Sequence, residues 1–120
     1  RMRTDLLEAE EAIRPAYRAF LQAAGLDEAG QQHLLAARRT NVCTAQYGLL
    51  TGPGKVAFGR RLALLRQIWA DKPARALLRR RAQTDPNRLL ALPYRACFAL
   101  NSPVLLAVFC QLKGLREKST

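Results

Sequence analysis

The chain has 120 residues, 49% of them hydrophobic, and carries a net charge of +11. This length suits one domain that buries roughly 65% of its unfolded surface, and the apolar content excludes wholesale disorder. The charge is uneven, because residues 1–35 hold four bases and six acids whereas residues 36–120 hold sixteen bases and three acids. A segment so basic indicates an anionic partner: a nucleic acid, an anionic lipid surface or an acidic protein.

The first part of the chain predicts two helices. Apolar residues recur at three- and four-residue spacing between positions 6 and 24, which is the period of an amphipathic helix. Pro15 is expected to kink or split this helix, because proline removes one backbone hydrogen bond and crowds the preceding turn. A second helix is expected after Asp27. The weak helix formers Thr40 and Asn41 leave open whether it is one helix or two shorter ones.

A Thr-Gly-Pro-Gly break at positions 51–54 leads into the most basic stretch of the chain. Residues 55–82 hold nine Lys or Arg residues against the single acid Asp71. Apolar residues at spacings of four, three and four predict one helical stripe here. The stripe consists of Phe58, Leu62, Leu65 and Trp69. Pro73 then suits the first turn of a new helix, where its missing N–H would have no intrahelical partner.

The basic residues of these two helices are the candidate site for an anionic surface. They are Arg60, Arg61, Arg66, Arg79, Arg80 and Arg81. Trp69 is expected to supply apolar insertion beside them, because aromatic and leucine side chains enter a membrane surface where basic side chains meet its headgroups. The alternative is that the stripe is ordinary core and the arginines form a solvated face. The charge imbalance favours binding.

The last part of the chain predicts helices near residues 86–100 and 103–113, each preceded by a capping residue and a proline. Between positions 89 and 112 the chain is strongly apolar, but a membrane-spanning helix needs about 20 largely uninterrupted apolar residues. Two prolines, Arg95 and Asn101 interrupt this segment, so a buried or interfacial helical hairpin is expected. The predicted fold is therefore all-α, an irregular bundle of about five or six helices in a single domain, residues 1–120.

Nothing in the sequence predicts catalysis, a metal or a cofactor. The three cysteines, Cys43, Cys97 and Cys110, match no zinc-ligand spacing, and the single His33 adds none. Each cysteine lies among apolar residues, which predicts buried free thiols in a reducing compartment. We expect this chain alone not to be catalytic, with no catalytic residue, no metal and no cofactor.

Three short segments resemble the region that follows the catalytic domain in bacterial family 2 glycosyltransferases. They are Asp-Leu-Leu-Glu-Ala at 5–9, Phe-Leu at 20–21 and Gly-Leu at 25–26, and the Arg- and Leu-rich segment 60–81 is also similar. The family's catalytic part carries a D-x-D metal motif, which this chain lacks. The resemblance therefore implies a C-terminal, non-catalytic accessory portion of a larger enzyme. Such regions help to form the acceptor side and associate with the membrane surface, where lipid-linked acceptors reside.

The resemblance and the charge pattern together favour peripheral association with the cytoplasmic face of the inner membrane. Two alternatives remain open from the sequence: a basic helical nucleic-acid-binding module, and a helical protein-interaction domain with an acidic partner. Steep salt dependence would distinguish a nucleic-acid binder, because its affinity depends on the number of phosphates that it neutralises.

Overall fold

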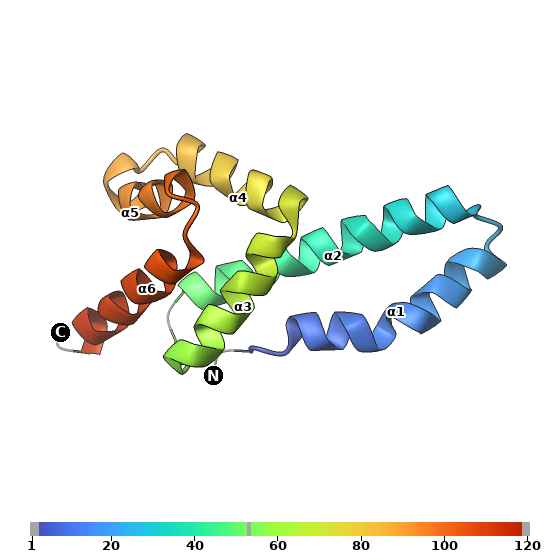
Figure 1. The fold of residues 1–120 in the computed structure, drawn as a ribbon, viewed down its shortest axis with the longest axis horizontal. Coiled ribbons are helices and arrows are strands. Elements are labelled where there is room, and N and C mark those ends of the chain that lie inside the picture. Colours follow the sequence, from blue (N-terminus) through green and yellow to red (C-terminus); the bar gives the residue numbers. More distant parts are fainter. Residues whose placement is uncertain (1–2, 53, 119–120) are drawn as a thin grey trace.

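The computed structural model describes residues 3–52 and 54–118, the last four by their backbone alone. All regular structure in these residues is helical, which confirms the predicted all-α bundle (Figure 1). The described helices are α1 (Leu6–Ala23), α2 (Glu28–Thr51), α3 (Phe58–Ala70), α4 (Lys72–Thr84), α5 (Arg88–Ala99) and α6 (Pro103–Lys118).

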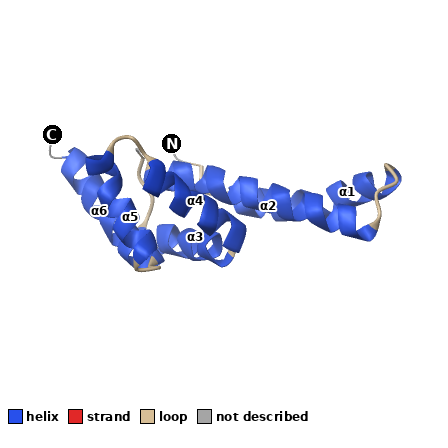
Figure 2. Ribbon diagram, turned by 90° about the horizontal axis from the view of Figure 1, so that it is seen from above, coloured by secondary structure: helices blue, strands red, loops and turns tan. Residues whose placement is uncertain are grey.

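The helices form two regions of different thickness (Figures 1 and 2). We call residues 6–35 the arm: α1 and the start of α2 lie side by side and extend away from the other helices. We call residues 36–118 the body, in which α3 packs on α6, α4 packs on α5, and the end of α2 packs on α3 and α4. The molecule is elongated, with extents of 54 × 29 × 21 Å.

Short polar side chains fix where several helices begin. The Asp27 carboxylate accepts a hydrogen bond from the Gly30 amide at 2.8 Å, and Asp71 accepts one from Ala74 at 3.0 Å. Each of these contacts satisfies an amide that has no partner within its helix. The predicted starts after Asp27 and at Pro73 are therefore confirmed.

Two predicted boundaries change in the structure, and two alternatives that the sequence left open are resolved. Helix α5 begins at Arg88 rather than near residue 86, because Asn87 is its capping residue. Helix α6 extends beyond residue 113 to Lys118. Helix α1 continues through Pro15 and bends along its length instead of splitting (Figure 1). Helix α2 is one helix, and the Thr40 hydroxyl in its middle donates to the Asp71 carboxylate at 3.1 Å.

The body contains the hydrophobic core. Its fully buried side chains are Cys43, Leu50, Leu64, Leu65, Ile68, Ala74, Leu106 and Ala107. Trp69 stacks on Phe98 with ring centroids 4.7 Å apart, and this aromatic pair joins α3 to α5. A buried leucine contributes roughly 1.5–3 kcal/mol relative to an exposed one, so the core concentrates stability in the body.

The arm buries far less apolar surface. Leu7 joins the core of the body, while further out only Leu21 and Leu35 are buried apolar residues. Phe20 remains 68% exposed and Ile13 47% exposed, because no third helix covers the pair. None of the described helices is long and apolar enough to cross a membrane.

Candidate anion-binding surface

Two of the six predicted basic residues, Arg60 and Arg61, make contacts within the protein or are buried in it. Arg60 donates to the Thr4 carbonyl at 2.8 Å and pairs with the Glu8 carboxylate, so it fastens α3 to the base of the arm. Arg61 is only 5% exposed and lies in the buried face of α3. The assignment of Arg61 to an anionic surface is therefore corrected: its side chain is in the interior. The paired Arg60 is also unavailable while its contact with Glu8 is made.

The predicted role of Trp69 is wrong for a physical reason. Trp69 is 6% exposed, stacks on Phe98, and donates its indole N–H to the Asn101 side-chain oxygen at 2.8 Å. A side chain held in the core by both its ring and its polar atom is not free to insert into a membrane. The buried face of α3 includes Leu64 and Ile68, so it is broader than the predicted stripe and turned away from the exposed Phe58.

The other predicted arginines are exposed but do not act together. Arg66 is exposed on α3. Arg79, Arg80 and Arg81 are exposed on α4, where successive residues point about 100° apart around the helix axis. Arg79 and Arg80 line one hollow, whereas Arg81 lines another beside Asp85.

The hollow beside Arg79 and Arg80 is a basic groove between α4 and the end of α5, with a volume of about 590 Å³. Its lining residues are Lys72, Arg75, Ala76, Arg79, Arg80 and Gln83 of α4, with Phe98, Ala99 and Asn101 opposite. Four of these nine residues are cationic and none is acidic. Among the side chains that the structure describes, none of the four cations forms an ion pair.

Helix stability does not account for the cations of the basic groove. Lys72 and Arg75 lie in the first turn of α4, which contains no acid, although the positive end of the helix dipole disfavours cations there. Arg75 and Arg79 are four residues apart, a spacing at which like charges repel by about 0.2–0.5 kcal/mol. The Asp71 carboxylate that caps α4 offsets part of this cost, but the repulsion between Arg75 and Arg79 remains, which favours a role in binding an anion.

Sequence reasoning identified Arg79 and Arg80 but missed Lys72, Arg75 and Asn101. Lys72 and Arg75 carry a usable signal, because they precede Arg79 by seven and four residues and therefore share its helix face. Asn101 carries none, since it reaches the groove only through the turn between α5 and α6.

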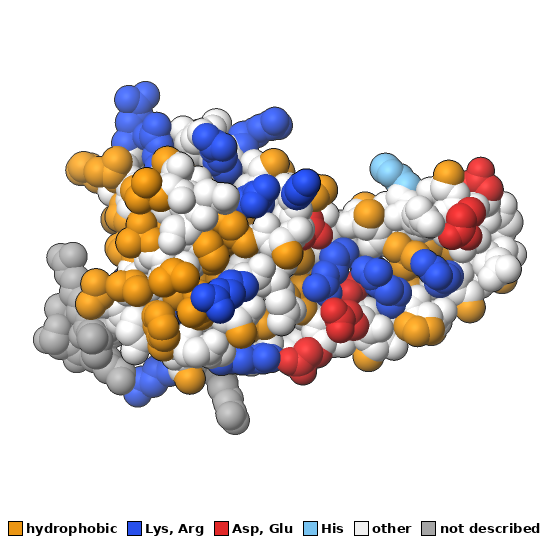
Figure 3. Space-filling view, in the orientation of Figure 1, with side chains coloured by type: hydrophobic (Ala, Val, Ile, Leu, Met, Phe, Trp, Pro, Cys, Tyr) orange, Lys and Arg blue, Asp and Glu red, His pale blue; other side chains and the backbone are white. Residues whose placement is uncertain are grey.

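Beside the basic groove, α5 and α6 present an exposed apolar face (Figure 3). The exposed fractions are 84% for Leu89, 59% for Leu92 and 68% for Leu100, residues that share one side of α5. On α6 the exposed apolar residues are Val104, Leu105, Val108 and Leu112. The opposite sides of both helices are buried, so the predicted hairpin is partly core and partly surface. Leu100 is adjacent in sequence to Ala99 and Asn101, which line the basic groove, and α4 packs on α5, so the apolar face and the groove lie on neighbouring helices.

The cysteines do not form a reactive site. All three are free and buried, as predicted. Burial, with a smaller effect from the Asp71 carboxylate, raises the pKa of the Cys43 thiol to about 11. Burial also raises the pKa of Cys110, an effect that the nearby Arg61 and Lys113 partly oppose. Thiols with raised pKa values are poor nucleophiles and metal ligands at neutral pH. Within the described part of the chain, no three His, Cys, Asp or Glu side chains lie together as a metal site.

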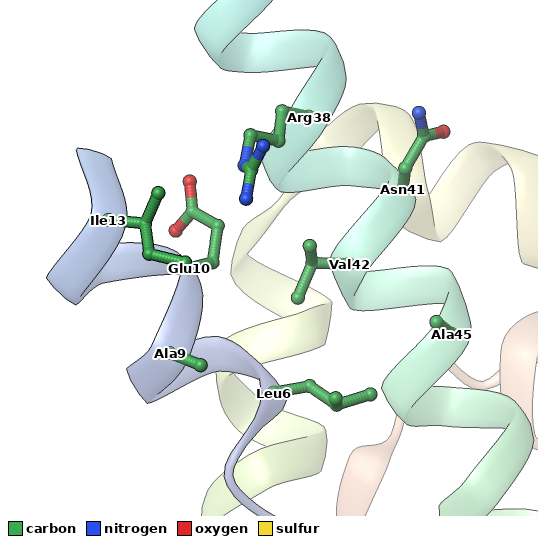
Figure 4. Close-up of a pocket in the computed structure, with 8 residues that line it drawn as sticks. All are labelled: Leu6, Ala9, Glu10, Ile13, Arg38, Asn41, Val42 and Ala45. Carbon is green, nitrogen blue, oxygen red and sulfur yellow. The ribbon is translucent and has the colours of Figure 1, made fainter. Parts of the chain in front are cut away.

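A second hollow, of about 390 Å³, lies between α1 and α2 (Figure 4). Its walls are mostly apolar, and they come from Leu6, Ala9 and Ile13 of α1 and from Val42 and Ala45 of α2.

Glu10 and Arg38 lie at one end of this second hollow (Figure 4). Glu10 is 2% exposed, and both its oxygens are occupied, one by Arg14 at 3.0 Å and one by Arg39 at 3.1 Å. A carboxylate held by two arginines serves as a structural joint between the helices, so this hollow offers no free acid or base.

Comparisons of the chain with protein-family models, curated proteins and solved structures found no match.

Proposed function

We propose that this chain is a non-catalytic helical region that associates peripherally with an anionic membrane surface through α4, α5 and α6. The observation that carries the proposal is the exposed apolar face of α5 and α6, on helices next to α4, whose groove cations form no ion pair among the described side chains. The apolar side chains enter the interface and the arginines meet the anionic headgroups. The surface differs from the predicted one: Leu89, Leu92 and Leu100 replace Trp69 as the inserting residues.

The two halves of this surface act by different forces. Each basic residue near an anionic leaflet contributes about 1 kcal/mol at moderate ionic strength. Removing an exposed leucine from water contributes up to roughly 1.5–3 kcal/mol, depending on how fully it is covered. A surface that combines both forces should bind anionic vesicles more tightly than neutral ones, and should keep part of its affinity when salt screens the charges.

The alternative of nucleic-acid binding is less well supported by this surface. Single-stranded nucleic acids stack their bases on exposed aromatic side chains. Here the aromatic residue in the basic groove, Phe98, is 4% exposed, and its ring is already stacked on Trp69. The exposed apolar residues beside the groove are leucines, which suit acyl chains better than bases.

A position beside a glycosyltransferase catalytic domain, on the cytoplasmic face of the inner membrane, remains part of the proposal and rests on the sequence resemblance. A membrane-facing accessory region would hold such an enzyme close to lipid-linked acceptors. Detection of a nucleotide-sugar-binding domain in the same polypeptide would support this placement.

The test is vesicle flotation with phosphatidylcholine vesicles that contain or lack phosphatidylglycerol. We compare the wild-type chain with Leu89→Ser/Leu100→Ser, and use Ile13→Ser/Phe20→Ser on the arm as the matched control. Because all four side chains are substantially exposed, both variants should fold. We expect the first variant to lose at least about tenfold in affinity, equivalent to 1.4 kcal/mol, and the second to lose little. Equal losses, or tight nucleic-acid binding without vesicle binding, would refute the membrane proposal.

A further inference from the structure

We infer that the basic groove is a binding site for the phosphate monoester headgroup of a membrane lipid. The inference rests on the proposed membrane association, and adds to it a defined headgroup chemistry and a defined place of binding. The groove is lined by four cations of α4, by Asn101, whose side chain is held by the core, and by two small side chains, features that distinguish it from a solvated basic face.

The cations of the groove lie along one side of α4 because of helix geometry. Lys72, Arg75 and Arg79 recur at three- and four-residue spacing, and Arg80 follows on the same side, so all four line one hollow of α4. Guanidinium groups bind phosphate oxygens through two parallel hydrogen bonds, while the lysine ammonium acts as a compact charge. A monoester has more unsubstituted oxygens and more charge than a diester, so it gains more from a hollow lined by four cations.

The wall opposite α4 is held in place by Asn101. Its φ angle is +53°, in the left-handed region that asparagine tolerates better than most residues, and its backbone N–H donates to the Phe98 carbonyl at 3.1 Å. Its side-chain oxygen accepts the Trp69 indole N–H, which orients the NH₂ group as the remaining donor. Trp69 is itself fixed by its stacking on Phe98. The Asn101 side-chain amide is therefore positioned by the core before any ligand arrives.

The groove is open because small side chains line it on both sides. Ala76 and Ala99 are both exposed and face the hollow from its two walls. A larger residue at position 76 would occupy the hollow without altering any charge. Because α4 packs on α5, a headgroup among the arginines would leave the acyl chains near the exposed leucines of α5.

The first measurement compares vesicles of phosphatidylcholine with either phosphatidic acid or phosphatidylglycerol, adjusted to equal surface charge. We expect the wild-type chain to bind the phosphatidic acid vesicles about tenfold more tightly, because only this lipid offers a phosphate monoester. Arg79→Gln/Arg80→Gln and Ala76→Leu should each abolish the preference. Arg66→Gln/Arg81→Gln removes the same charge from outside the groove and should retain it. Circular dichroism and thermal melting verify that each variant folds.

The second measurement titrates the chain with inorganic pyrophosphate and follows the Asn101 side-chain amide by NMR. A shift in the wild-type chain that is lost in Ala76→Leu supports a phosphate site in the groove. If the chain binds pyrophosphate but no vesicle, the source of the phosphate is soluble, and both the lipid assignment and the proposed membrane function are overturned.

Two further outcomes distinguish the proposed headgroup site from the proposed membrane association. If the wild-type chain binds both kinds of vesicle equally, or if both double-arginine variants change the preference equally, the headgroup site is overturned and the membrane function stands. If neither vesicles nor pyrophosphate bind, both proposals fail.

Discussion

The arm and the body use charge in opposite ways. Every ion pair among the described side chains involves an acid at positions 5–11, at the start of the arm. Glu10 holds Arg14 and Arg39, and Glu8 holds Arg60 from the body, so the acids of the arm join helices. The cations of α4 have no such partners. The acids at the start of the chain hold α1 to α2 and α3, whereas the cations of the groove on α4 have no ion pair among the described side chains.

The two regions also differ in what holds their helices together. The body has a core of fully buried residues from α2, α3, α4 and α6, while the arm has two helices, few buried apolar residues and the buried Glu10 joint. A two-helix hairpin of this kind is expected to open locally at lower free energy than the body. We therefore expect the arm to be the more adaptable region and the body, which carries the proposed binding surface, the more rigid one.

The largest expected effect compares a buried leucine of the body with a buried leucine of the arm. Leu65→Ala should lower the free energy of unfolding by about 3–4 kcal/mol, because Leu65 is fully buried among packed helices. Leu35→Ala on the arm should cost about 2 kcal/mol, since a site between two helices can collapse onto the smaller side chain. Urea denaturation measures both losses. Hydrogen exchange should show opening confined to the arm in Leu35→Ala. Opening throughout the body in that variant would contradict the proposed independence of the arm.

The next effect concerns the joint at the base of the arm. Glu10→Gln should cost about 2–3 kcal/mol, less than a fully buried pair because Arg14 and Arg39 are partly exposed. Glu11→Gln is the matched control. It removes an exposed contact to Arg39 at 3.4 Å and should cost no more than about 0.5 kcal/mol. Equal stability losses in thermal or urea denaturation would show that Glu10 is not the joint.

The sequence predicts the helices of this fold well, and the reasons are local. The three- and four-residue periodicity identifies the helical segments, and Asp27 and Pro73 mark two of the helix starts. These signals depend on residues within one or two turns of one another, so they can be seen without tertiary information.

The candidate site was only partly predictable, because it depends on which helix face the body covers. Arg61 reads as a surface residue, yet it is buried, and an arginine can enter a helix interface because its aliphatic stem packs against apolar neighbours. Trp69 reads as amphipathic and membrane-seeking, but Phe98 and Asn101 hold it in the core. These contacts join residues about thirty positions apart, and no local pattern contains them.

The third prediction tests the link between the core of the body and its surface. Trp69→Phe retains an aromatic ring against Phe98 but removes the hydrogen bond to Asn101, and should lower stability by about 1 kcal/mol. It should also weaken pyrophosphate binding, because the Asn101 amide loses the contact that orients it. Unchanged binding with reduced stability would show that Asn101 does not need Trp69 to form the groove wall.

The smallest expected effect is a gain in stability. Arg79→Gln/Arg80→Gln removes the repulsion between Arg75 and Arg79 and reduces the positive charge crowded on one face of α4, while it breaks no ion pair among the described side chains. We expect the free energy of unfolding to rise by about 0.2–0.5 kcal/mol at low salt, and the gain to shrink as salt screens the charges. Thermal melting at two ionic strengths measures it.

The control for this gain is Arg14→Gln on the arm, where the loss of one positive charge breaks the pair with Glu10 and should lower stability. A gain from the α4 variant and a loss from the arm variant would mean that removing positive charge relieves repulsion in one region and breaks a structural contact in the other. If the α4 variant is instead destabilised, Arg79 and Arg80 contribute to the fold, and their lack of acidic partners no longer supports a role in binding.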